Sequence, residues 1–131
     1  MSIKFWINLV AFLLGVFASP FFLNAAGNPV RGIVRVAGDL YRFQNNFHYS
    51  VFLVTPDGII VTDPINTEVA NWLKSELKRR FNKPVKYLIY SHHDEDHISG
   101  GEVFSDTAIV IAHEKAVAAI AADKVLTALR I

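Results

Sequence analysis

The sequence predicts an α/β fold in which β-hairpins are followed by a β-α-β-α alternation. Three observations predict it: a turn motif between two β-branched runs, a segment with apolar residues at helical spacing, and two short apolar runs, VKYLIY and AIVIA. Strands that alternate with helices imply helices packed on a sheet. In such sheets, ligands collect at the carboxyl ends of the strands, where the loops leave the core.

The composition of the chain excludes several functional classes. The 131 residues suggest one domain at most. The formal net charge of +1 does not indicate the basic surface that binds nucleic acid, so no nucleic-acid partner is expected. The absence of cysteine excludes disulfides, thiolate metal ligands and a cysteine nucleophile. The hydrophobic content of 52% is high, and the excess lies at the N-terminus.

Residues 1–26 are predicted to be a signal peptide or an N-terminal membrane anchor. Lys4 is the only charge, residues 5–23 are mostly apolar, and small residues follow them. About 20 apolar residues can also span a bilayer, but Pro20 interrupts the stretch and favours cleavage. We therefore expect export to the bacterial periplasm or secretion, with anchoring in the inner membrane if residues 5–23 are retained.

β-hairpins are predicted between residues 30 and 62. Residues 30–43 alternate loosely in polarity, which indicates one or two strands with a turn at Gly38–Asp39. The clearest hairpin is residues 49–62, where Thr55–Pro56–Asp57–Gly58 separates two β-branched and aromatic runs. Proline and glycine stand there where a type I turn favours them.

A helix is predicted over residues 67–81, where the apolar side chains fall on one stripe. Asn66 or Thr67 suits its N-cap, and Asn82–Lys83–Pro84 ends it. The run at 85–90 predicts a strand buried on both faces.

A second buried strand is predicted at residues 108–112, followed by an alanine-rich helix at 114–130. A polar cluster, YSHHDEDHISGG at residues 90–101, stands directly after the first of the two buried strands, and Asp63 follows the hairpin. Both therefore lie at carboxyl ends of strands, where a site is expected.

The cluster has the residue types of a metal site. Imidazole and carboxylate are the ligands that zinc, iron and manganese share. One tight loop could present two ligands to one ion and two to a second, which suits a binuclear site that acidifies water. The alternative is a solvated polar loop, with His93 and Glu95 facing water. The candidate metal ligands are His92, Asp94, Asp96 and His97.

These residues resemble the signature His-x-His-x-Asp-His of the metallo-β-lactamase superfamily. The likeness extends over about residues 33–120, and the strand that ends in Thr62–Asp63–Pro64 is part of it. The resemblance implies the N-terminal half of an αββα sandwich, so residues 30–131 are expected to be a partial domain of that type. It also implies a metal-dependent hydrolase that uses one or two zinc ions.

The resemblance further implies a role for each matching residue. His92 would bind the first metal, and Asp96 and His97 would bind the second. Asp96 would also be catalytic, because the matching aspartate orients the attacking water. Asp63 would brace the ligand loop from behind through hydrogen bonds, as residues behind metal ligands commonly do.

Two departures from the family pattern affect this interpretation. Asp94 stands where the second histidine is expected, and a carboxylate favours iron or manganese relative to zinc. The ligands that the family draws from its C-terminal half are missing, and His113 matches a position that is usually not a ligand. A truncated chain is favoured over a dimer or a non-catalytic remnant, and whether the chain is an enzyme stays open.

The expected function is hydrolysis of an ester, thioester or amide bond in a lactam-like or lactone-like small molecule, through a metal-bound hydroxide. The alternative is an exported remnant that binds metal weakly or only associates with a partner. His48 precedes a hairpin strand and is a candidate substrate contact, with a surface histidine as the simpler interpretation. A half sandwich would leave one sheet face uncovered, and such a face favours self-association.

Overall fold

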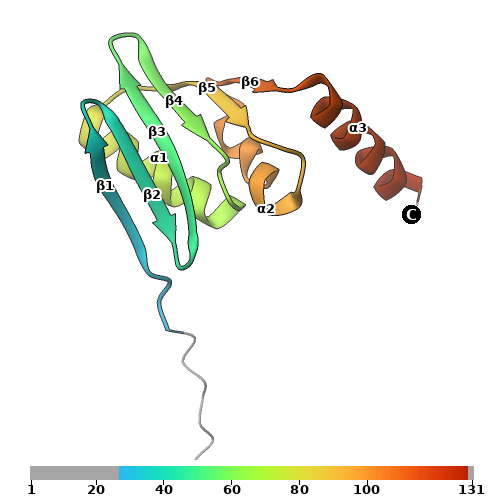
Figure 1. The fold of residues 1–131 in the computed structure, drawn as a ribbon, viewed down its shortest axis with the longest axis horizontal. Helices are drawn as coiled ribbons and strands as arrows, with labels where there is room; N and C mark the ends of the chain where they lie inside the picture. Colours follow the sequence, from blue (N-terminus) through green and yellow to red (C-terminus); the bar gives the residue numbers. More distant parts are fainter. Residues whose placement is uncertain (1–26, 130–131) are drawn as a thin grey trace, which may run out of the picture.

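The computed structural model describes residues 27–129, which form one mixed sheet with helices beside it (Figure 1). The strands are β1 (Arg31–Ala37), β2 (Leu40–Asn45), β3 (His48–Thr55), β4 (Gly58–Thr62), β5 (Val85–Tyr90) and β6 (Ile109–Ala112). The helical elements are α1 (Thr67–Phe81), α2 (Glu95–Ile98), the 3₁₀ turn η1 (Gly101–Phe104) and α3 (Glu114–Leu129).

The strands lie side by side in chain order, from β1 to β6. The first three neighbouring pairs are antiparallel, because short turns join them into hairpins. The pairs β4–β5 and β5–β6 are parallel, because α1 and the α2–η1 segment carry the chain back between them. The predicted α/β order is confirmed, and the carboxyl ends of β4 and β5 meet at one edge of the sheet.

Helix α1 has the boundaries that the sequence predicts. Asn66 is its N-cap, and its side-chain Oδ1 accepts a hydrogen bond from the backbone N–H of Val69 at 2.9 Å. Asn82 ends the helix in the left-handed region, with φ 51°, and Pro84 follows two residues later. The N-terminus of α1 therefore lies close to the end of β4, on the side of the sheet where the polar cluster stands.

The hydrophobic core lies between α1 and one face of the sheet. One row of side chains shows how the register builds it: Phe52 opposes Val61, which opposes Leu88 on β5, and all three are almost fully buried. Tyr41 stacks on Phe52 with ring centroids 5.0 Å apart, which extends the row to β2. The core is thus continuous from β2 to β5.

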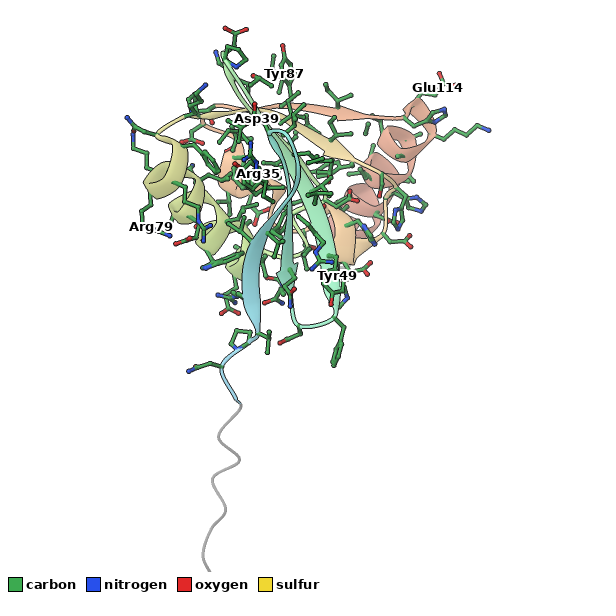
Figure 2. The ribbon with its side chains drawn as sticks, turned by 60° about the vertical axis from the view of Figure 1, so that its left-hand side comes forward. Arg35, Asp39, Tyr49, Arg79, Tyr87 and Glu114 are labelled. Atoms are coloured by element: carbon green, nitrogen blue, oxygen red, sulfur yellow. The ribbon has the colours of Figure 1, made fainter. Side chains whose placement is uncertain are left out.

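The opposite face of the sheet is not covered by any described residue. Two rows of paired side chains cross it. The first row is Leu40, Leu53, Ile60, Tyr87 and Ile109, and the second is Arg42, Val51, Thr62, Ile89 and Ile111. We call these two rows the open face. Leu53, Tyr87 and Ile109 are 39%, 40% and 63% exposed. Figure 2 labels Tyr87 and shows the side chains along the sheet.

The prediction of a second buried strand is wrong. β6 is the last strand of the sheet, and Ile109, Val110 and Ile111 are all exposed. Its apolar character predicts burial, but the open face leaves one side of β6 uncovered. On the other side Val110 faces a hollow of about 700 Å³ that α3 borders through Val117. Strand β5 is likewise open on one face at Tyr87.

The predicted signal or anchor at residues 1–26 lies outside the described residues. Among residues 27–129, no helix is both long enough and apolar enough to cross a membrane. Membrane anchoring and export therefore stay predictions.

Candidate metal site at the end of β5

The polar cluster and Asp63 lie together because β4 and β5 are parallel neighbours. Thr62 pairs with Ile89, and the backbone N–H of Asp63 donates to the carbonyl of Ile89 at 3.0 Å. Asp63 has a positive φ of 32°, and its side chain is 13% exposed. The chain thus turns sharply at Asp63, and its carboxylate faces the first residues after β5.

Asp63 holds the start of the cluster through Ser91. Asp63 Oδ1 accepts from the Ser91 backbone N–H at 2.8 Å, and Oδ2 accepts from the Ser91 hydroxyl at 2.6 Å. A two-point contact of this kind fixes both the backbone and the side chain of Ser91. Hydrogen bonds to a charged acceptor are the strong ones in proteins. Ser91 was not expected at the site, and only the Asp63 contacts identify it.

Ser91 in turn sets the tautomer of His92. The Ser91 hydroxyl has one proton and gives it to Asp63, so at 2.8 Å its oxygen accepts from the His92 Nδ1–H. A neutral His92 then carries its lone pair on Nε2. This nitrogen lies 3.4 Å from Asp94 Oδ2. Two acceptors face each other there, and a cation between them would satisfy both.

Asp96 and His97 form a second pair of the same kind. His97 Nε2 lies 3.6 Å from Asp96 Oδ2, and His97 Nδ1 lies 3.2 Å from Asp63 Oδ2. That Nδ1 contact lacks hydrogen-bond geometry, so the buried nitrogen has no hydrogen-bond partner among the described residues. Both residues belong to the short helix α2, and their side chains lie next to each other.

The two pairs are adjacent, since the ring centroids of His92 and His97 are 3.8 Å apart. His48 reaches the second pair from the β2–β3 hairpin, with Nε2 3.9 Å from Asp96 Oδ2. His93 Nε2 lies 3.9 Å from Asp94 Oδ1, so this residue also borders the first pair. Each predicted ligand therefore lies within one cluster.

His113 makes its side-chain contact outside the cluster. It follows β6, and its Nδ1 accepts from the backbone N–H of Lys115 at 3.2 Å. Among the described residues, no contact of its side chain joins it to the cluster, and its interpretation as a non-ligand stays a prediction.

The donor set fits a metal ion in chemistry and in pair spacing. Two ligand atoms on a tetrahedral zinc are about 3.3 Å apart, given bonds of about 2.0–2.1 Å, and the two pairs stand at 3.4 and 3.6 Å. Within residues 27–129, however, no group of three such side chains stands close enough to hold an ion without movement. The side chains therefore have to move to close a site.

Gly100 fixes the loop that follows the cluster. Its φ is +87°, and a Cβ at this position would lie 2.6 Å from the backbone carbonyl of Asn66. Both Gly100 and Gly101 allow close packing of this loop. A Cβ on Gly101 would overlap the hydroxyl of Tyr90.

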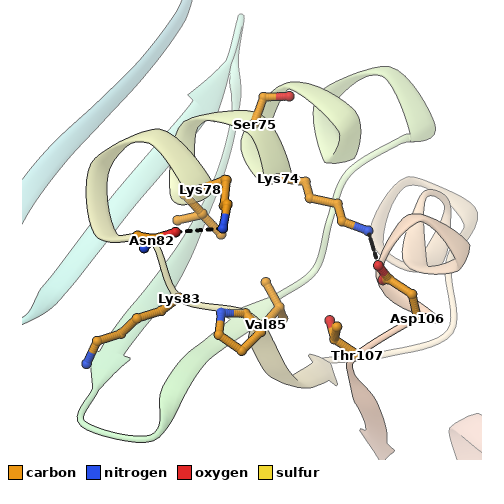
Figure 3. A pocket seen from close by; sticks show the side chains of 10 residues that line it. Lys74, Ser75, Lys78, Asn82, Lys83, Val85, Asp106 and Thr107 are labelled. Atoms are coloured by element: carbon orange, nitrogen blue, oxygen red, sulfur yellow. Dashed lines mark hydrogen bonds and ion pairs between the residues drawn. The ribbon is translucent and has the colours of Figure 1, made fainter.

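A separate hollow of about 530 Å³ lies at the other end of β5 (Figure 3). Its basic groups are already engaged. Lys74 Nζ donates to both oxygens of Asp106 at 2.8 and 2.9 Å and lowers the pKa of that carboxyl. Lys78 Nζ donates to Asn82 Oδ1 at 2.6 Å. The Lys74–Asp106 contact joins α1 to the segment before β6, and the Lys78–Asn82 contact lies at the C-terminal end of α1, so we assign both a structural role.

A comparison with protein families matches the part of the chain that contains the candidate site. A family model described as the metallo-beta-lactamase superfamily matches residues 44–123, which is more than half of the chain. No curated protein matches the sequence.

Solved structures of three metallo-β-lactamases resemble the fold. The enzyme from Pontibacter korlensis has a TM-score of 0.66 at 16% identity, and the one from Hirschia baltica 0.64 at 12%. FIM-1 from Pseudomonas aeruginosa, in its mono-zinc form, has 0.62 at 10%. Each match covers 72% of this chain and 49%, 48% and 46% of those chains, respectively. The chain therefore spans about half the length of these structures, and the expected fold class is confirmed.

Proposed function

Because this chain belongs to the metallo-β-lactamase superfamily, a family of metal-dependent hydrolases, we propose that it provides a zinc site for hydrolysis of an ester, thioester or amide bond. When bound, a metal ion in such a site lowers the pKa of water and polarises the substrate carbonyl. The whole activity is part of the proposal, since the chain spans about half of the matched structures.

One observation carries the proposal. Two imidazole nitrogens, Nε2 of His92 and Nε2 of His97, each face a carboxylate oxygen of the same short segment, at 3.4 and 3.6 Å. Their Nδ1 atoms both face the group formed by Asp63 and Ser91. Histidines that bind metals commonly have their second nitrogen held by a neighbouring polar group. Here the Ser91 hydroxyl contacts Nδ1 of His92, and Asp63 Oδ2 lies 3.2 Å from Nδ1 of His97 without hydrogen-bond geometry.

Some residues of the chain would bind the metal, and others would orient the metal ligands and the attacking water. His92, Asp94, Asp96 and His97 would hold metal, and Asp63 would keep both imidazoles in the binding tautomer. The Asp96 carboxylate is 57% exposed and borders a polar hollow of about 570 Å³ with Asn66 and Ser99. We propose that it orients the attacking water by accepting a hydrogen bond from it.

Asp94 influences which metal is held. A carboxylate in place of an imidazole adds a negative charge and a harder donor, which favours iron or manganese relative to zinc.

The test of the proposed metal site is the metal content of the full chain after equilibration with each ion and desalting, measured by elemental analysis. Wild type should retain metal, and Asp96→Ala and His97→Ala should lose it.

Hydrolysis of chromogenic lactam, lactone and thioester probes would then identify the bond. Retention of no more metal by wild type than by the double variant Asp96→Ala/His97→Ala would reject the proposal. Metal retention without hydrolysis of any probe would favour a non-catalytic remnant that binds metal.

The second candidate is association through the open face, with a second copy of the chain as the partner. The open face extends over five strands, about 19 Å at the usual spacing. Two copies of it can pack about a two-fold axis as the facing sheets of a sandwich do. Contiguous exposed apolar side chains such as Leu53, Tyr87 and Ile109 favour association between protein surfaces.

Tyr87→Lys tests this association, because Tyr87 is in the centre of the first row and 40% exposed. We expect wild type to sediment as a dimer and Tyr87→Lys as a monomer. Phe47→Lys is the matched control, since Phe47 is 92% exposed at the tip of the β2–β3 hairpin. A monomeric wild type would overturn the dimer.

A further inference from the structure

His48 approaches the cluster from a different element than the other candidate ligands. Its Nε2 lies 3.9 Å from Asp96 Oδ2, and the same oxygen lies 3.6 Å from Nε2 of His97. Two imidazole nitrogens therefore converge on one carboxylate oxygen. An ionised carboxylate oxygen only accepts, so each ring either donates its Nε2–H to this oxygen or, with its lone pair on Nε2, can share a cation with it.

The position of His48 is set by the fold. His48 pairs with Asn45 across the β2–β3 turn, and Asn46 at the tip adopts φ 53°. The turn is held by Val30, whose carbonyl accepts from the Asn46 N–H at 2.7 Å and whose N–H donates to Asn46 Oδ1 at 2.9 Å. Arg31 adds a contact of 3.0 Å to Asn45 Oδ1. A hairpin end that is fastened in this way can supply a ligand.

We propose that His48 is a metal ligand and completes the Asp96–His97 pair as a His₂-carboxylate site. This inference rests on the proposed metal-dependent function and assigns a ligand that the signature at residues 92–97 does not contain. Three protein ligands leave a fourth position open, which is the arrangement of catalytic rather than structural zinc.

The side chains have to move to close the site, because no group of three such side chains among the described residues stands close enough to hold an ion. The separations of 3.9 and 3.6 Å have to shorten to about 3.3 Å. The side chains of His48 and Asp96 are 55% and 57% exposed, so more than half of each is open to solvent rather than packed. Both border the hollow of about 570 Å³ between the hairpin and α2, which gives room for an ion.

Metal titration of single-site variants tests the assignment. Zinc is titrated into metal-free full-length protein by calorimetry, for wild type, His48→Ala, His97→Ala and His113→Ala. We expect His48→Ala and His97→Ala to weaken zinc binding by about tenfold or more, which is at least the cost of losing a supporting residue. His113→Ala is the matched control, because its side chain has no described contact with the cluster.

The outcomes separate this inference from the proposed function. Wild-type affinity in His48→Ala, together with weakened binding in His97→Ala, overturns the His48 assignment and leaves the proposed function standing. Absence of zinc binding by wild type overturns both. Weakened binding in both variants, with unchanged helical circular dichroism, supports both.

A cysteine substitution gives a readout that a purely structural role cannot produce. The chain has no cysteine, so His48→Cys introduces a single thiol. If residue 48 binds the ion, cobalt(II) added to His48→Cys gives a thiolate-to-metal charge-transfer absorption, because a ligating thiol is deprotonated by the metal. Phe47→Cys, one residue away and fully exposed, should lack this band. Absence of the band in His48→Cys overturns the assignment.

Discussion

Asp63 and Ser91, 28 positions apart, are joined by two hydrogen bonds that connect the ends of β4 and β5. Both oxygens of the Asp63 carboxylate are used, and Oδ2 also faces Nδ1 of His97 at 3.2 Å. The ligand loop therefore depends on one carboxylate for the backbone of Ser91 and, through the Ser91 hydroxyl, for the tautomer of His92.

Asp63→Asn should weaken both the fold and the site. The asparagine amide can accept from the Ser91 N–H through its one oxygen, but its NH₂ cannot accept from the Ser91 hydroxyl. We expect a loss of about 1–3 kcal/mol in the free energy of unfolding and a loss of about 10–100-fold in zinc affinity. Urea denaturation and zinc titration measure the two effects.

The matched control is Asp57→Asn, in the turn between β3 and β4. Aspartate and asparagine are equally suited to the position before a turn glycine, so neither stability nor zinc affinity should change. An Asp63→Asn variant with wild-type zinc affinity would show that Asp63 supports the fold alone.

Gly100→Ala should destabilise the fold through the contact between the cluster loop and the N-cap of α1. The φ of +87° is unfavourable for alanine, and the new Cβ would lie 2.6 Å from the carbonyl oxygen of Asn66. A backbone atom cannot move aside as a flexible side chain can, so we expect a loss of about 1–3 kcal/mol. Chemical denaturation measures it.

Gly32→Ala, in β1, is the matched control, because the nearest atom to its Cβ would be Gln44 Cγ at 4.0 Å. We expect a change within about 0.5 kcal/mol. Equal unfolding midpoints for the two variants would mean that the loop moves freely away from Asn66.

The helical and hairpin elements could be predicted from the sequence because each has a local signal. The stripe of α1, its Asn66 cap and the turn at Thr55–Pro56–Asp57–Gly58 specify their own structures. Helix α2 could not be predicted, since its four residues EDHI are mostly charged and too few to show apolar periodicity. The predicted burial of β6 is wrong. The apolar side chains of Ile109 and its neighbours indicate a strand, but the sequence does not tell which part of the protein covers it.

The candidate site was predictable where its residues are close in sequence. His92 to His97 form one short run, and their residue types indicate a metal. Two long-range relations were not predictable: the double hydrogen bond of Asp63 to Ser91, and the approach of His48 to Asp96. The first depends on the parallel pairing of β4 and β5, and the second on the length of the β2–β3 hairpin.

A comparison of two aliphatic truncations should show that the core is one-sided. Leu88 on β5 is fully buried against α1, so Leu88→Ala should cost about 2–5 kcal/mol. Ile109 on β6 is 63% exposed, and in dilute solution Ile109→Ala should change stability by less than about 0.5 kcal/mol. Chemical denaturation at two protein concentrations measures both, and a concentration-dependent loss for Ile109→Ala would instead indicate burial in a dimer.

Glu76 on α1 should make the stability of the protein depend on pH in the acid range. Hydrogen bonds from Arg79 and then Arg80 lower the pKa of Glu76 from 4.5 to about 2. Arg79 donates at 2.7 and 3.1 Å, and Arg80 at 2.8 Å. Because the pKa is lower in the folded state, the ionised carboxylate stabilises the fold above pH 4.5. That contribution is lost as the pH falls from 4.5 toward 2.

Glu76→Gln removes this contribution, so its effect should depend on pH in the same way. The free energy of unfolding of Glu76→Gln should fall below that of wild type by about 1 kcal/mol or less at pH 7, because Arg79 and Arg80 are exposed and solvent screens the pair. The difference should shrink between pH 4.5 and 2, and high salt should reduce it at pH 7. Urea denaturation across this range measures it. A difference that stays constant down to pH 2 would show that glutamine disturbs the helix for a reason other than charge.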